Sequence, residues 1–148
     1  SFPYMDGYTE SYRGQVLMRE CDILGHMNNQ YYGSRISVAM CNMFYAIGLD
    51  PDDLKNGKRG LAVVHQDSRY VAELHAGDII HMESAVVGSS EKTVTFDHRL
   101  YNSVDDGLVF SSRMVSAYMD LESRKAIPLS DTIRQKLVDL ITDGEKAS

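Results

Sequence analysis

The chain has 148 residues, of which 43% are hydrophobic and 24% are charged, a composition typical of a globular protein with one core. Its formal charge of -6, with no basic run to offset it, argues against nucleic-acid binding. We therefore expect a single domain over residues 1–148, with its core at about residues 12–140.

Signals for secretion or membrane insertion are not evident in the sequence. No apolar stretch approaches the roughly 20 residues needed to span a bilayer, and Ser1–Glu10 has no basic segment followed by an apolar run. The cysteines, Cys21 and Cys41, form no metal-binding spacing. We expect a cytoplasmic protein with two free thiols, although one disulfide is also compatible with the sequence.

The first half of the chain contains one predicted strand and one predicted long helix. Residues 12–18 indicate the strand. From Asn29, apolar residues recur at helical spacing until Gly48, which predicts a helix with one strongly apolar face. Such a helix is better suited to burial against a sheet than to the surface. The proline and glycine in residues 49–60 predict a loop.

The second half alternates between strand-like runs and turns. The runs lie at about residues 61–72, 79–88, 93–102 and 108–120, and the short connections suit antiparallel neighbours. After Pro128, Ser130-Asp131 is expected to cap a short closing helix, with a frayed tail at 143–148. This order of elements predicts an α+β protein in which one helix packs against a curved antiparallel sheet.

The segment from Arg19 to Tyr32 carries the clearest functional signal. Asp22 follows a predicted strand end, a glycine-containing turn comes next, and Asn28-Asn29 opens the long helix. A helix N-terminus offers free N–H groups and positive partial charge to a developing oxyanion. An aspartate, normally ionised near neutrality, can act as base or nucleophile. A capping or turn role for Asp22 is the alternative.

The same segment resembles a known family. The run from Asp22 to Asn29, followed by Tyr32, is similar to the Asp-x-x-Gly-His-Val-Asn-Asn-x-x-Tyr pattern of hot-dog-fold acyl-CoA thioesterases of the 4-hydroxybenzoyl-CoA thioesterase type. The likeness covers roughly residues 12–140 and continues through Tyr70, Ala76-Gly77-Asp78, Lys92-Thr93-Val94-Thr95-Phe96 and Pro128-Leu129.

The resemblance implies a fold and an activity. It implies the hot-dog fold, with a long central helix wrapped by a five-stranded antiparallel sheet. Homodimers would form by joining sheets edge to edge, commonly then homotetramers, with active sites at the subunit interface. The reaction would be hydrolysis of an acyl-CoA thioester, with Asp22 as base or nucleophile and N–H groups near Asn29 as the oxyanion hole. CoA would be part of the substrate, and no other cofactor is expected.

Neighbouring residues are further candidates with open alternatives. His26 could hydrogen-bond Asp22 or the substrate carbonyl, or could simply pack. Asn28 and Asn29 could orient substrate, although their side chains are more typical of helix caps. Tyr32 is expected in the core or in the acyl pocket.

Two later segments are further candidates, one as a contribution from another subunit and the other as a contact with CoA. In the dimer implied by the resemblance, His65, Gln66 and Ser68 would face the partner helix, or alternatively solvent. Lys92 and Thr93 fall where relatives bring a strand to CoA, and Lys92 could meet a phosphate or be an exposed turn residue.

Other functions compete with thioester hydrolysis. The histidines lack ligand spacing in the sequence, so no metal is expected. Hot-dog hydratases and dehydratases carry an Asp-x-Asn-Pro-x-His signature, and this chain contains no Asn-Pro. A non-catalytic acyl-CoA-binding protein is the other alternative. The acyl group stays open, and an acyl carrier protein substrate would need a local basic patch.

Overall fold

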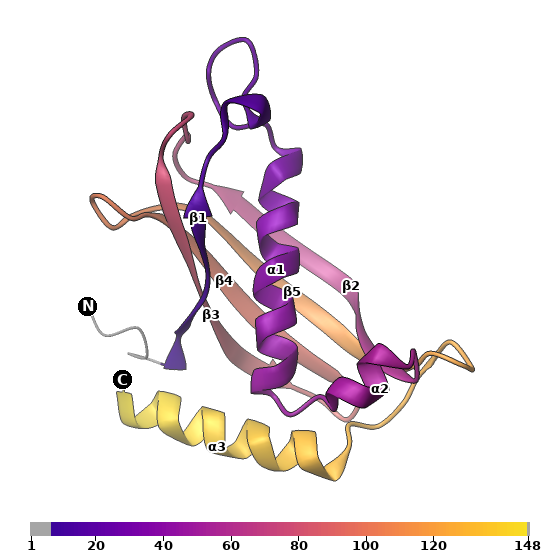
Figure 1. Ribbon diagram of the computed structural model, residues 1–148. Helices are drawn as coiled ribbons and strands as arrows, with labels where there is room; N and C mark the ends of the chain where they lie inside the picture. The colour runs from indigo at the N-terminus through magenta and orange to yellow at the C-terminus, as the bar shows by residue number, and fades with distance from the viewer. Residues whose placement is uncertain (1–6, 148) are drawn as a thin grey trace.

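The computed structural model describes residues 7–147, with side chains described as far as Leu140. Its strands are β1 (Thr9–Gln15), β2 (Arg59–Tyr70), β3 (Ile79–Ser89), β4 (Thr93–Asn102), β5 (Gly107–Asp120) and β6 (Lys125–Ala126). Its helices are the 3₁₀ helix η2 (Met18–Glu20) and the α-helices α1 (Gln30–Ala46), α2 (Pro51–Lys55) and α3 (Asp131–Ala147). Figure 1 shows α1 lying across one face of a curved sheet, as the hot-dog fold requires.

The sheet is antiparallel throughout and has the strand order β1-β3-β4-β5-β2, with the two-residue β6 added to β5. β2 therefore forms one free edge, and a register shift between Val63 and His65 interrupts its pairing with β5. Side chains alternate between the two faces of each strand. On β5, Phe110, Met114 and Tyr118 face the helix, while Arg113 points outward and is exposed.

The core lies between α1 and the sheet. The buried residues of α1 include Ile36, Ala39 and Met43, which recur at helical spacing, and they belong to one cluster with Phe96 and Leu100 of β4. The apolar face predicted for residues 29–48 therefore packs against the sheet as expected. Gly48, at φ +94°, ends the helix in the left-handed conformation that glycine adopts readily.

Two predictions about elements in the first half of the chain were wrong. The first strand covers Thr9–Gln15 rather than residues 12–18, because Glu20 accepts the Leu17 N–H at 2.8 Å and closes η2 at this point. Residues 49–60 are not only a loop. Asp50 accepts the Asp52 N–H at 2.9 Å and Pro51 occupies the first helical position, so the residues expected to form a loop start the short helix α2.

The closing helix is longer than expected. α3 runs through Asp131–Ala147, as long as α1, so the backbone of the tail predicted to fray is helical up to Ala147. Ser130 accepts the Ile133 N–H at 3.3 Å, and Ile133 and Leu137 enter the core.

The described cysteines are both free. Cys21 is half-buried, and its Sγ lies 3.7 Å from the Leu17 carbonyl oxygen, whereas Cys41 is exposed on α1. Across the described chain, no helix combines the length and hydropathy that crossing a membrane would require.

Candidate functional site

Asp22 lies at the start of a tight loop. The Asp22 N–H donates to the His26 carbonyl at 2.9 Å, and the Gly25 N–H donates to the Asp22 carbonyl at 3.0 Å. Gly25 has φ +82°, which is the conformation that closes a three-residue hairpin loop of this kind. A bridge between Cys21 and Met27 extends the hairpin on either side. The Asp-x-x-Gly spacing therefore specifies the backbone that presents Asp22.

The carboxylate of Asp22 is held by backbone donors. Its Oδ1 accepts the Leu24 N–H at 2.9 Å and the His26 N–H at 3.2 Å. Within the described residues, Oδ2 takes part in no hydrogen bond, and the residue is exposed. One oxygen thus fixes the orientation of the group, and the other is available to a ligand.

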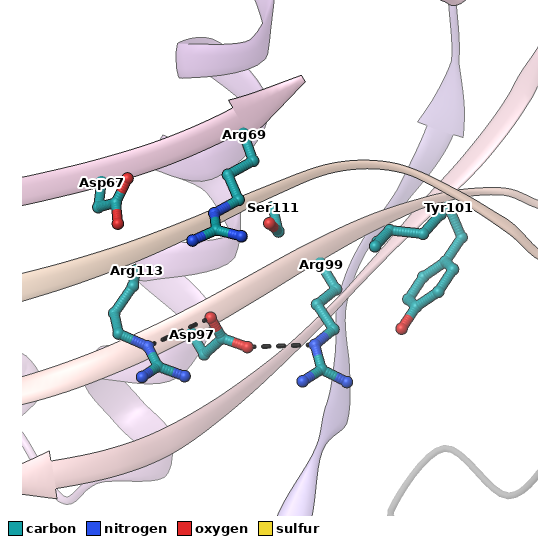
Figure 2. A pocket seen from close by; sticks show the side chains of 8 residues that line it. Asp67, Arg69, Asp97, Arg99, Tyr101, Ser111 and Arg113 are labelled. Carbon is teal, nitrogen blue, oxygen red and sulfur yellow. Dashed lines mark hydrogen bonds and ion pairs between the residues drawn. The ribbon is translucent and has the colours of Figure 1, made fainter. Parts of the chain in front are cut away.

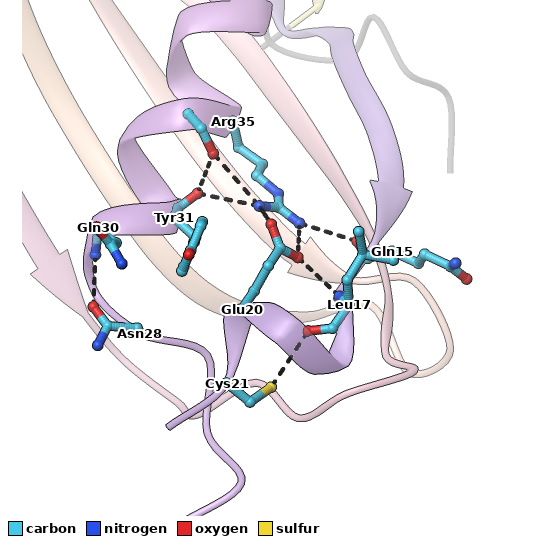
Figure 3. Close-up of polar contacts among 9 residues, drawn as sticks. Gln15, Leu17, Glu20, Cys21, Asn28, Gln30, Tyr31 and Arg35 are labelled. Atoms are coloured by element: carbon cyan, nitrogen blue, oxygen red, sulfur yellow. Dashed lines mark hydrogen bonds and ion pairs between the residues drawn. The ribbon is translucent and has the colours of Figure 1, made fainter. Parts of the chain in front are cut away.

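A buried ion pair anchors the chain just before this loop (Figure 3). Arg35 of α1 and Glu20 are each 6% exposed and form a bidentate pair, with Arg35 Nη1 bonded to Glu20 Oε2 and Nη2 at 2.7 Å from Oε1. Arg35 also donates to the Gln15 carbonyl at 3.0 Å. The pair lowers the pKa of Glu20, chiefly through the hydrogen bond from Arg35. It ties the end of β1 and η2 to the first turns of α1.

The start of α1 presents an unpaired donor. The Asn28 side chain accepts the Gln30 N–H at 3.2 Å, so it caps the helix as expected (Figure 3). Asn29 is the N-cap residue, but its side chain makes no capping bond, contrary to the prediction for the asparagine pair. In the described part of the chain, the Asn29 N–H has no hydrogen-bond partner. A free N–H at the end of a 17-residue helix is available to an anion.

A hollow of about 600 Å³ joins these features. It lies between the Asp22 loop, the start of α1 and the segment after β2. Its lining consists of Asp22, Leu24, His26, Met27, Asn29, Tyr32, Tyr70, Val71, Ala72 and Glu73. The structure therefore brings Asp22, His26, Asn29 and Tyr32 into the lining of one hollow.

The hollow has an aromatic wall. The Tyr32 ring centroid lies 5.1 Å from that of Tyr70 and 4.8 Å from that of Phe110. Tyr32 is buried, and this burial raises the pKa of its hydroxyl. Packed rings beside a carboxylate make a site that accepts an apolar group next to a polar reaction centre.

The predicted β2 residues do not line this hollow. Gln66 and Ser68 pair with Met114 and Ser112, so they lie on the helix-facing side of the sheet, whereas His65 points to the other face. Gln66 Nε2 donates to Ser68 Oγ at 2.9 Å, and Ser68 Oγ lies 2.9 Å from Ser112 Oγ. Strand alternation separates His65 from the other two, and the facing of these residues toward a partner helix stays a prediction.

Lys92 and Thr93 lie at the opposite end of β2 from Asp22. Thr93 pairs with Ala117, which pairs with Ala62 near the start of β2, while Tyr70 at the end of β2 lines the hollow. The eight residue-to-residue steps from Ala62 to Tyr70 span roughly 26 Å at about 3.3 Å per step. Within one chain, the two predicted CoA contacts therefore do not approach Asp22.

One prediction was that His26 could hydrogen-bond Asp22. Its backbone N–H does so, but its ring contacts Glu73 and His75 instead. Its Nε2 lies 3.0 Å from Oε2 of Glu73, and its ring centroid is 5.0 Å from that of His75. His26, Glu73 and His75 place one potential metal-ligand atom each within 4.8 Å of one another. The histidines are scattered in sequence, but a backbone bridge between His26 and His75 brings two of them together.

A second hollow of about 390 Å³ lies on the outer face of the sheet (Figure 2). The side chains of Arg69, Arg99 and Arg113 point into it around Asp97. Asp97 is buried and accepts the Tyr8 hydroxyl at 2.5 Å, with Arg99 Nε at 3.2 Å and Arg113 Nε at 3.6 Å. Arg69 and Tyr70 point to opposite faces of β2, so this hollow is separate from the Asp22 site.

Several site residues were missed in the sequence. Glu20 and Arg35 were not singled out, although a charged residue among the apolar positions Tyr32, Ile36 and Ala39 is a signal for a buried pair. Glu73 and His75 follow the end of β2 and carry no local motif. Only the fold shows that they face the Asp22 loop.

Known proteins share this architecture. The chloroplastic acyl-acyl carrier protein thioesterase ATL3 of Arabidopsis thaliana is 20% identical over 141 residues, covering 94% of this chain and 74% of that protein. A Staphylococcus aureus protein solved in complex with CoA superposes with a TM-score of 0.82 at 15% identity, covering 91% of this chain and 85% of that one. A Thermus thermophilus thioesterase complexed with coenzyme A and Zn gives a TM-score of 0.78 at 23% identity, covering 93% of this chain and 98% of that one.

The structural matches have low sequence identity and support the fold. A match to a protein family shows more than the fold. Residues 16–137 match the family described as the thioesterase-like superfamily, which takes in the Asp22 loop, α1 and the whole sheet after β1. The chain therefore belongs to the thioesterase-like superfamily.

Proposed function

We propose that this protein hydrolyses an acyl-CoA thioester to the free acid and CoA at the Asp22 hollow. The observation that carries the proposal is the position of Asp22 and of the free Asn29 N–H in the lining of one hollow. Membership of the thioesterase-like superfamily and the CoA-bound structural neighbours support this reaction class.

Each group has a defined role in the reaction. The Asn29 N–H and the positive end of α1 bind the carbonyl oxygen as negative charge develops on it. In one route, Asp22 accepts a proton from water as the water oxygen bonds to the carbonyl carbon. In the other, an Asp22 oxygen attacks the carbonyl carbon and water then hydrolyses the anhydride. In both, the C–S bond breaks and the CoA thiolate leaves and takes up a proton.

We propose that the site is completed by a second copy of the chain. β2 is a free sheet edge, and Val63 and Val64 on it are 47% and 62% exposed. A long edge strand with exposed apolar residues favours pairing with another strand. Antiparallel pairing of two β2 strands would bring the start of one, near Lys92 and Thr93, toward the end of the other, near Asp22. A homodimer, and a homotetramer built from it, are therefore our proposal for the assembly.

The acyl group is proposed to lie against the aromatic wall of Tyr32 and Tyr70. An aromatic acyl group, as the motif of the 4-hydroxybenzoyl-CoA type suggests, fits such a wall by ring stacking. The Arabidopsis relative is named for acyl-acyl carrier protein substrates, which makes a carrier-bound thioester the main alternative donor. CoA is the donor that we favour, because two of the structural neighbours were solved in complex with it.

The second candidate function is acyl-CoA binding without hydrolysis. Asp22 accepts two backbone N–H groups, and a carboxylate in a loop can be retained for this structural purpose alone. Hydration or dehydration on the same fold is less favoured, because the chain lacks the Asn-Pro of that signature.

Assay of a panel of aromatic, short branched and medium-chain acyl-CoAs, together with acyl carrier protein thioesters, separates these functions. We expect release of free thiol from at least one acyl-CoA. Saturable binding of acyl-CoAs without thiol release would favour the binding protein. With an enoyl-CoA in the same panel, loss of the enoyl absorbance without thiol release would favour the hydratase.

A further inference from the structure

The rim of the hollow carries three side chains whose types and positions suit a transition metal. His26 and His75 lie directly opposite each other in a two-residue antiparallel bridge, so their side chains share one face. Glu73 precedes His75 by two residues and therefore lies on that face as well. Two imidazoles and one carboxylate are a ligand set that Zn²⁺ accepts, with water at the remaining position.

From this arrangement, we propose that His26, Glu73 and His75 bind one Zn²⁺ ion per chain, across the gap between the Asp22 loop and the segment after β2. The proposal rests on the geometry of these three residues and does not require that the protein hydrolyse thioesters.

The distances between the groups fit this assignment. Tetrahedral zinc with bonds of about 2.0–2.1 Å sets its ligand atoms about 3.4 Å apart. His26 Nε2 and Glu73 Oε2 already lie 3.0 Å apart, and the widest separation within the trio is bounded by 4.8 Å. The Glu73 side chain is 66% exposed and that of His75 is 56% exposed. Rotation of these exposed side chains can close the remaining gap of about 1–1.5 Å at little cost.

The surroundings of His75 also favour a cation. The Asp78 carboxylate accepts the His75 N–H at 2.8 Å and lies 3.8 Å from Nδ1 of the ring. A carboxylate next to a metal-binding histidine fixes the ring and adds negative charge near the ion. Gly77, at φ +89°, lets the chain turn back so that Asp78 reaches His75.

A bound ion would have a structural consequence for the hollow. His26 belongs to the loop that presents Asp22, and Glu73 belongs to the opposite wall. In the described structure, the side chains of these two walls meet here through the His26–Glu73 pair, whose Nε2 and Oε2 atoms lie 3.0 Å apart. A metal would replace that pair with two coordinate bonds and hold the loop against the β2 side of the hollow.

Calorimetric titration of the metal-free protein with Zn²⁺ tests the proposal. We expect one saturable site per chain and an affinity at least about 10-fold weaker in each of His26→Gln, Glu73→Gln and His75→Ala. His65→Ala removes an exposed histidine of β2 and is the matched control, which should bind Zn²⁺ as the wild type does. Co²⁺ should give a tetrahedral visible spectrum in the wild type that His75→Ala lacks.

Thermal unfolding gives a second readout. Zn²⁺ should raise the unfolding midpoint of the wild type and of His65→Ala, but not that of His75→Ala. Midpoints measured without metal show whether each variant is folded. If His75→Ala is not folded, Glu73→Gln, which preserves side-chain size, serves as the test variant. The proposal is overturned if the wild type binds no stoichiometric Zn²⁺, or if Glu73→Gln and His75→Ala bind it as tightly as the wild type.

Discussion

The buried histidine of β4 should make the stability of this protein strongly pH-dependent. His98 is completely buried, its Nδ1 lies 2.6 Å from Ser84 Oγ, and its Nε2 lies 3.1 Å from Met40 Sδ. Burial lowers the pKa of His98 from 6.5 to about 4, and the nearby charge of Asp97 offsets only part of this effect. The folded protein therefore holds a neutral imidazole where the unfolded chain is protonated.

The sign and size of the effect follow from that difference. Between pH 6.5 and about pH 4, the unfolded state binds a proton that the folded state does not. The contribution of His98 to stability is therefore complete above pH 6.5 and is lost as the pH falls. The full interval corresponds to about 3.4 kcal/mol at about 1.36 kcal/mol per pH unit. About 2 kcal/mol of it is lost between about pH 7 and pH 5.

Urea unfolding at a fixed protein concentration measures this loss. We expect the unfolding free energy of His98→Gln to fall by about 2 kcal/mol less than that of the wild type between about pH 7 and pH 5. Comparison of the two slopes removes any general destabilisation by the substitution. His65→Gln, at an exposed position, should keep the wild-type slope. Equal pH slopes in His98→Gln and the wild type would refute the reasoning.

Three further predictions concern the elements that build the site. Glu20→Gln leaves Arg35 buried without its carboxylate and should lower the unfolding free energy by about 3–5 kcal/mol in denaturant titrations, and a loss under about 0.5 kcal/mol would contradict the anchoring role. Val64→Lys places a charge on the free edge of β2 and should shift sedimentation from dimer toward monomer, whereas an unchanged dimer would exclude that edge. Gly25→Ala meets open space but must adopt φ +82°, so it should cost about 1 kcal/mol and reduce kcat by disturbing the Asp22 loop, and a wild-type kcat would show that the loop geometry is not needed.

Much of the fold follows from local patterns. The helix over Gln30–Ala46 and the strands after Arg59 were predictable, because their apolar spacing and turn residues act over a few neighbours. α2 was missed because Asp50-Pro51 favours both a turn and a helix start, and only the side-chain cap decides between them. The length of α3 was underestimated because the polar residues near its end show no helical periodicity of apolar positions.

The candidate site was predictable only where it is local in sequence. Asp22, Gly25, Asn28 and Asn29 lie in one run, so their turn and cap could be inferred from spacing. The Glu20–Arg35 pair depends on contact between segments that no local pattern connects. The approach of His75 to His26 likewise depends on how the end of β2 meets the Asp22 loop. The face on which His65 lies depends on a register shift in β2, which the sequence does not indicate.

The central claim, that the Asp22 carboxylate performs the chemistry, is tested most directly by thiol release from the best acyl-CoA substrate in Asp22→Asn. Asparagine keeps an oxygen that can accept the Leu24 and His26 N–H groups, so the loop should persist. Asp50→Asn alters the same kind of carboxylate cap in α2, away from the lining of the hollow, and is the matched control. We predict that kcat falls by about 10²–10⁴ in Asp22→Asn and is unchanged in Asp50→Asn. A wild-type kcat in folded Asp22→Asn would contradict the account.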